Sequence, residues 1–258
     1  MAQGYHSRFD SVFLDFEGTL NDTQASGRLY ARDFIATVGR MHPGEPARWI
    51  GAIITSLADV RALQEKAAAE PWLGYDAYRR RELVIWLRSL YGAAGVALPD
   101  EDDQVYRLAW ELEEAIPVRF APLSGVDQTI RDLAARGLRL HIASGANSRY
   151  VSRCLSDGGL IELFCGVYGP DNLDTLKSGA DFFRRAFSAA GCVPSHCLVV
   201  DDSPGPVRWA LEAGARAIQV GPDPSVPAEG PDDRRTGQEV VCVSSLEQVV
   251  SVVNGMSR

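Results

Sequence analysis

A short apolar run that ends in two acidic residues is the feature that most constrains how this chain can fold. Residues 12–20 read Val-Phe-Leu-Asp-Phe-Glu-Gly-Thr-Leu, so Asp15 and Glu17 follow an apolar stretch and precede a Gly-Thr turn. A buried parallel strand reads as such a run, and ligand sites in open α/β sheets lie where these strands end. Packing explains two carboxylates there poorly. They suit a carboxylate nucleophile with an acid/base partner, a site for a hard metal ion, or both.

Two more apolar runs, at residues 138–143 and 197–200, also end in polar residues, and a lysine lies between them in the sequence. The candidates at these positions are Ser144, Gly145, Lys177, Asp201 and Asp202. Each has an ordinary alternative. The two aspartates could cap the helix expected from Pro204, the serine and Thr19 could stabilise turns, and the lysine could be an exposed residue at a helix start.

The order of the predicted segments indicates an α/β core interrupted by a helical insert. Strands are expected at 11–16, 138–143, 166–168, 197–200, 217–220 and 240–243, and helices at 126–136, 148–155, 179–190, 204–213 and 246–253. Such alternation with short connections implies right-handed crossovers and a parallel sheet. Residues 221–237 are rich in Pro, Gly and Asp and are expected to form a loop.

The insert shows apolar residues three and four positions apart, which predicts helices at 27–38, 47–70, 76–91 and 100–116. Four of the five tryptophans lie there, and they suit either helix packing or the wall of a substrate pocket. We therefore expect a Rossmann-like α/β core with helices on both faces, made of residues 1–20 and 118–258. An all-helical domain is expected at 21–117.

Composition sets limits on partners and location. The formal net charge is −8 and no basic block occurs, so neither a nucleic-acid nor a membrane partner is expected. No apolar stretch is long enough for a spanning helix, and the N-terminus has no signal-type region, so a cytoplasmic protein is the default. The five cysteines form no Cys-x-x-Cys pair, and His141 is expected to be a core histidine with satisfied ring nitrogens. Whether the protein is a monomer or a homodimer is left open.

The ordered motifs Asp-x-Glu-Gly-Thr, Ser, Lys and Asp-Asp resemble those of the haloacid dehalogenase superfamily, whose members are mostly phosphatases. The resemblance covers residues 9–20 and 118–220. It implies a Mg²⁺-dependent phosphatase that hydrolyses a small phosphorylated metabolite through an aspartyl-phosphate intermediate. It also implies that the helical insert is a cap over the active site, with residues 21–24 and 119–122 as its hinge strands.

By the same resemblance, Asp15 is the nucleophile and also a magnesium ligand. The backbone carbonyl of Glu17 and the side chain of Asp202 complete the protein's share of the metal shell, and Asp201 ligates directly or through water. The side chain of Glu17 acts as the acid/base group.

The remaining motif residues are expected to hold the phosphate. Ser144, with the backbone around Gly145, would bind a phosphate oxygen, and the Thr19 hydroxyl is a second candidate. Lys177 would balance the charge of Asp15 and of the transferring phosphoryl group, although the usual Lys-Pro pair is replaced by Lys-Ser.

Glu17 is the larger departure from the family pattern, because most phosphatases of the superfamily carry Asp there. Enolase-phosphatases carry Glu, whereas dehalogenases and phosphonate hydrolases usually carry a non-acidic residue, so an acid favours phosphate esters. Two alternatives stay open. One is a sugar-phosphate mutase or another phosphoryl transferase that uses the same nucleophile, and the other is a non-catalytic metabolite-binding module with a detuned site.

Overall fold

The computed structural model describes residues 9–42, 46–67, 70–221 and 240–256. The chain divides into two compact units, an α/β unit of Met1–Thr23 and Phe120–Arg258 and a helical unit of Gln24–Arg119. Apart from Gly221, the loop expected at 221–237 lies outside the described residues.

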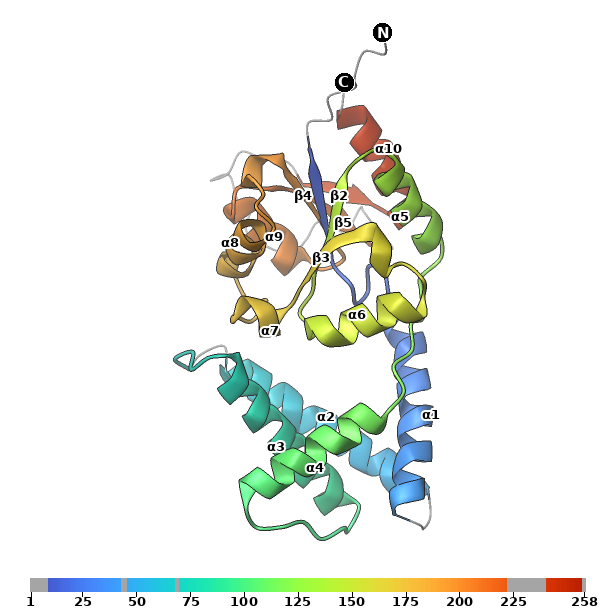
Figure 1. Ribbon diagram of the computed structural model, residues 1–258, viewed down its shortest axis with the longest axis vertical. Helices are drawn as coiled ribbons and strands as arrows, with labels where there is room; N and C mark the ends of the chain where they lie inside the picture. Colours follow the sequence, from blue (N-terminus) through green and yellow to red (C-terminus); the bar gives the residue numbers. More distant parts are fainter. Residues whose placement is uncertain (1–8, 43–45, 68–69, 222–239, 257–258) are drawn as a thin grey trace. The chain divides into compact units, whose positions relative to one another are not determined.

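The α/β unit is built on a six-stranded parallel sheet. Figure 1 shows this sheet among the helices of the unit. Its strands are β1 (Ser11–Leu14), β2 (Arg139–Ala143), β3 (Phe164–Tyr168), β4 (Cys197–Asp201), β5 (Arg216–Val220) and β6 (Val241–Val243). They run in the order β3-β2-β1-β4-β5-β6, with every neighbouring pair parallel. The strand before the insert is therefore central, between the two strands whose ends carry the other motifs, and the predicted fold class is confirmed.

Helices cover both faces of this sheet (Figure 1). They are α5 (Val126–Ala135), α6 (Ser148–Asp157), α7 (Pro170–Leu173), α8 (Ala180–Ala189), α9 (Pro204–Glu212) and α10 (Leu246–Met256). Side chains alternate along a strand, so Phe13 and Val199 pack toward α8 and α9, for example against Phe183 and Phe187. Among the described residues, α7 is the one α-helix that the sequence did not predict.

The helical unit contains α1 (Thr23–Met41), α2 (Ala47–Ala67), α3 (Tyr75–Ala93) and α4 (Asp102–Ala115). Its own core includes Phe34, Trp49, Leu87 and Val105, all buried. In the part of the chain that the structure describes, no helix is both long enough and apolar enough to cross a membrane.

The expectation of a hinge strand at residues 21–24 was wrong. Helix α1 already begins at Thr23, and only Asn21 makes β-bridges, to Glu17 and to Pro122. The chain entering the helical unit at residue 22 and the chain leaving it at residue 121 are joined by a backbone hydrogen bond, in which Asp22 N donates to the carbonyl of Ala121 over 2.7 Å.

His141 is in the core, as expected, but its nitrogens are not satisfied. It is 2% exposed, its ring stacks on that of Phe13 with centroids 4.6 Å apart, and neither ring nitrogen has a hydrogen-bond partner among the described residues. Burial lowers the pKa of His141 to about 4, so the ring is neutral at pH 7.

Candidate active site at the ends of the central strands

Strand β1 delivers Asp15 to the carboxyl end of the sheet. The strand ends at Leu14, and Asp15 N still donates to the carbonyl of Val200 over 2.8 Å. The chain then turns sharply, because Leu20 N and Asn21 N both donate to the carbonyl of Phe16. Asp15 is 6% exposed, so its carboxyl group needs charged or hydrogen-bonding partners.

The ammonium group of Lys177 binds acceptors at the ends of three strands. Its Nζ lies 2.6 Å from Asp15 Oδ1 at the end of β1, 2.7 Å from Asp201 Oδ2 at the end of β4, and 2.8 Å from the Ala143 carbonyl at the end of β2. A lysine ammonium has three donors, and here each has an acceptor on one of the three central strands. Asp15, Lys177 and Asp201, predicted from separate motifs, therefore meet.

The alternative role of Asp201 as the N-cap of α9 was wrong, because the N-cap is Ser203 and it has no side-chain capping hydrogen bond. Asp201 Oδ1 instead accepts from Ser203 N over 2.9 Å, in the turn just before α9 begins at Pro204. One carboxyl group thus holds this turn and pairs with the lysine.

Asp202 approaches the turn after Asp15 at Gly18. The φ of Gly18 is +85°, and a Cβ at residue 18 would collide with the carboxylate of Asp202. A glycine is required here both for the backbone conformation and for this close approach. The Gly of the Gly-Thr turn therefore lets the acid of the fourth motif lie beside the first motif.

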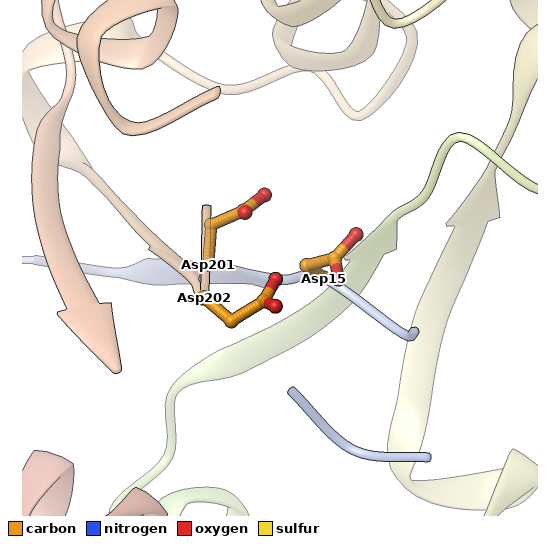
Figure 2. A group of neighbouring side chains, drawn as sticks. All are labelled: Asp15, Asp201 and Asp202. Atoms are coloured by element: carbon orange, nitrogen blue, oxygen red, sulfur yellow. The ribbon is translucent and has the colours of Figure 1, made fainter. Parts of the chain in front are cut away.

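The three aspartates form a cluster with an excess of negative charge. One oxygen from each of Asp15, Asp201 and Asp202 lies within 4.8 Å of the others, and Figure 2 shows the three side chains around one region. Burial and the neighbouring Asp201 raise the pKa of Asp202. For Asp15, burial together with the neighbouring Asp201 and Asp202 raises the pKa to about 7, against the opposing effect of Lys177.

The pKa of Lys177 is also raised, but burial and the neighbouring charges act on it in the opposite directions. Burial alone would lower its pKa, but the carboxylates of Asp15 and Asp201 raise it, so the ammonium stays charged. One ammonium among three carboxyl groups leaves a deficit of positive charge. The donor set, all hard oxygen atoms, fits a magnesium ion, which would relieve this deficit.

The predicted phosphate-binding residues surround the same strand ends. Ser144 follows β2 directly after Ala143, is buried, and its Oγ accepts from Ala146 N over 3.0 Å, which is the turn-serine interaction. At Gly145, a Cβ would contact Lys177. Thr19 is buried and its Oγ1 has no hydrogen-bond partner among the described residues, which is unusual for a buried hydroxyl.

Glu17 is held by two residues that the sequence did not identify as site residues. Its carboxyl group accepts from Asn21 Nδ2 over 3.0 Å and from the hydroxyl of Tyr150 on α6. Burial raises the pKa of Glu17 against the effect of both hydrogen bonds. Asn21 had been assigned only to a hinge. Tyr150 lies on an amphipathic helix, where periodicity gives no sign of a polar contact.

Comparison with known proteins confirms the predicted family and fold. The model of one protein family, described as haloacid dehalogenase-like hydrolase, matches residues 9–214. The chain belongs to this family.

The similar proteins include both phosphatases and dehalogenases. A bifunctional riboflavin kinase/FMN phosphatase of Arabidopsis thaliana is 28% identical over 133 residues, which cover 51% of this chain and only 34% of the relative's length. A 2-haloacid dehalogenase from Pseudomonas syringae has a TM-score of 0.63 at 22% identity, with 96% of this chain and 99% of that one covered. An HAD phosphatase from Thermococcus onnurineus has a TM-score of 0.60 at 15% identity, with the same coverages.

Proposed function

We propose that this haloacid dehalogenase-like hydrolase is a Mg²⁺-dependent phosphatase of a small phosphorylated metabolite, with Asp15 as the nucleophile. The observation that carries the proposal is the shared ammonium of Lys177, 2.6 Å from Asp15 and 2.7 Å from Asp201 at the ends of adjacent strands. A buried nucleophile next to a fixed positive charge suits attack on a highly charged phosphoryl group.

The chemistry divides into two steps. Asp15 Oδ attacks phosphorus, the bond from phosphorus to the ester oxygen breaks, and Glu17 gives a proton to the departing oxygen. Glu17 then takes a proton from water, which attacks the aspartyl-phosphate and regenerates Asp15 with release of inorganic phosphate. Lys177 balances the charge on Asp15, and the buried hydroxyl of Thr19 offers a hydrogen bond to a phosphate oxygen.

The proposed metal ligands are the side chains of Asp15 and Asp202 and the backbone carbonyl of Glu17. Asp201, already bound to Lys177 and to the N–H of Ser203, would act through water or directly. A bound magnesium ion would lower the pKa of the clustered carboxyl groups and neutralise charge on the transferring phosphoryl group.

An acid at residue 17 distinguishes this proposal from dehalogenation. In ester hydrolysis a carboxylic acid can protonate the leaving oxygen, whereas a halide ion leaves without a proton and needs no such acid. The FMN phosphatase named in the partial match is consistent with phosphate esters as the substrate class. We assign the helical unit the role of a cap that contributes to substrate selection.

The test is a panel of phosphorylated metabolites and p-nitrophenyl phosphate, with inorganic phosphate measured in the presence of Mg²⁺. We expect turnover that EDTA abolishes and Mg²⁺ restores. Asp15→Asn should lower kcat at least about 1,000-fold, because it removes the nucleophile while keeping the size of the side chain. Parental activity in Asp15→Asn would exclude the mechanism.

Product analysis separates the alternatives. A mutase would return an organic phosphate isomer with no release of inorganic phosphate. Binding of a metabolite without any turnover, both in the parent and in Glu17→Asp, would indicate the non-catalytic module. Release of halide from a 2-haloacid, with no hydrolysis of any ester, would indicate a dehalogenase.

A further inference from the structure

The carboxyl group of Glu17 lies between two hydrogen-bond donors from different parts of the α/β unit. Asn21 Nδ2 donates to Glu17 Oε2 over 3.0 Å from the turn that follows β1. The hydroxyl of Tyr150, on the first turn of α6, hydrogen-bonds the same carboxyl group and also contacts the thiol of Cys154. These two contacts are distinct from the Lys177 and aspartate contacts that surround Asp15.

Asn21 is held firmly. The residue is 0% exposed, its Oδ1 accepts from Ala121 N over 3.0 Å, and its own N–H donates to the carbonyl of Phe16 over 2.8 Å. Because Oδ1 faces a backbone donor, the amide can present only its NH₂ group to Glu17. The orientation of the side chain is therefore determined by its neighbours.

Tyr150 is held by the start of α6 and by its ring. Asn147 caps the helix by accepting from Arg149 N over 2.9 Å, and Ser148 N donates to Asp171 Oδ1 over 2.7 Å. The ring of Tyr150 packs edge-on against Phe16, with centroids 6.3 Å apart and an interplanar angle of 87°. A donor fixed in this way restricts the side chain that it binds.

We propose that Asn21 and Tyr150 are positioning residues that hold the longer side chain of Glu17 where it exchanges a proton with the leaving oxygen and with water. The proposal rests on the phosphatase function proposed above. Glu has one rotatable bond more than Asp, so its carboxyl group samples more positions unless contacts restrict it. Two donors on separate elements provide that restriction, and they explain how Glu can serve where most superfamily phosphatases carry Asp.

The test uses the leaving group to detect the acid. Departure of p-nitrophenolate needs little protonation, whereas an alkoxide needs a proton from the acid, so loss of acid catalysis affects alkyl phosphates most. We would measure kcat/KM for p-nitrophenyl phosphate and for one alkyl phosphate that the parent hydrolyses. The ratio of the two values reports on Glu17 and is insensitive to a uniform loss of active protein.

Two nearly isosteric variants remove one donor each. Tyr150→Phe removes only the hydroxyl, and Asn21→Asp keeps an acceptor for Ala121 N while it removes the NH₂ donor. We expect each to lower kcat/KM for the alkyl phosphate roughly 10-fold, and that for p-nitrophenyl phosphate much less. Tyr168→Phe, another tyrosine of the α/β unit, is the control and should leave the ratio unchanged.

A double-mutant cycle shows whether the donors act through Glu17. In the Glu17→Gln background, Tyr150→Phe should cause no further change in the ratio, because the acid is already absent. Equal ratios in the parent and both variants, or an undiminished effect of Tyr150→Phe in Glu17→Gln, would overturn the positioning role and leave the phosphatase proposal intact. Failure of the parent to hydrolyse any phosphate ester would overturn both. If Asn21→Asp does not fold, Tyr150→Phe decides the question alone.

Discussion

Buried aspartates in the two units have opposite electrostatic environments. In the helical unit, burial would raise the pKa of Asp33, but hydrogen bonds from Arg32 Nε at 2.8 Å and Arg119 Nε at 3.0 Å lower it. In the α/β unit, burial and two further aspartates raise the pKa of Asp15 despite its bond to Lys177. Two guanidinium groups face the single carboxylate of Asp33, whereas a single ammonium group faces the three carboxyl groups of the Asp15 cluster.

This difference distinguishes charges that stabilise a fold from charges that take part in chemistry. A fully paired carboxylate needs nothing more from solvent or ligand. A cluster of buried carboxyl groups with one ammonium gains free energy when a cation binds, and strongly perturbed groups of this kind gather at functional sites. We therefore expect the reaction to take place in the α/β unit and the charged pairs of the helical unit to stabilise its fold.

Among the tests of this contrast between the two units, removal of the shared ammonium should have the largest effect. Lys177→Met should lower kcat for p-nitrophenyl phosphate at least about 100-fold, because no fixed positive charge then balances Asp15 and the phosphoryl group. The matched control is Lys66→Met, at an exposed surface pair with Glu70 in the helical unit, which should leave kcat unchanged. A Lys177→Met enzyme with parental kcat would show that the cluster does not work as proposed.

A second expected effect concerns stability at low pH and originates in the α/β unit. Because the pKa of His141 is about 4 in the folded protein and 6.5 in the unfolded chain, the unfolded state binds more protons between these values. The free energy of unfolding should therefore be highest above pH 6.5 and should fall by up to about 3 kcal/mol as the pH decreases to 4.

Urea unfolding at a series of pH values measures this loss. His141→Phe should lose less stability than the parent between pH 6.5 and 4, since it has no ring to protonate. His196→Gln, at an exposed histidine of the same unit, should follow the parent. An identical pH dependence in His141→Phe and the parent would assign the acid sensitivity to other groups.

A smaller effect is expected from the charged pairs of the helical unit. Arg79 contacts Glu82 and Glu113, and its side chain is 18% exposed. Arg79→Met should lower the free energy of unfolding by about 1–3 kcal/mol, because it leaves a largely buried carboxylate of Glu82 without its cation. Arg131→Met removes an exposed pair with Asp127 in the α/β unit and should change the free energy of unfolding much less, because water screens such a pair.

Both variants would be compared by thermal unfolding and by turnover well below the unfolding temperature. We expect Arg79→Met to reduce stability and to retain kcat. A loss of kcat without a loss of stability would break the contrast between the units, since it would place Arg79 in the reaction.

Much of the fold could be predicted from local patterns. Apolar runs of three to six residues predicted the strands, and spacing of three and four predicted the long helices, because burial imposes these periods directly on the sequence. Helix α7, Pro170–Leu173, was missed because four residues are too few to show a helical period. The strand expected at 21–24 was wrong because extended pairing stops at Asn21, and the chain enters α1 at Thr23.

The candidate site was predictable as a set of residues but not as a set of contacts. The sequence alone supplied Asp15 and Asp201 as polar residues at the ends of apolar runs, and Lys177 through the motif order that resembles the family. Only the tertiary structure brought Lys177 to Asp15 across 162 residues, gave Asp201 two hydrogen-bond partners, and joined Tyr150 to Glu17. The physical reason is that periodicity reports which face of an element is buried, whereas the partner of a side chain depends on the order and register in which distant elements pack.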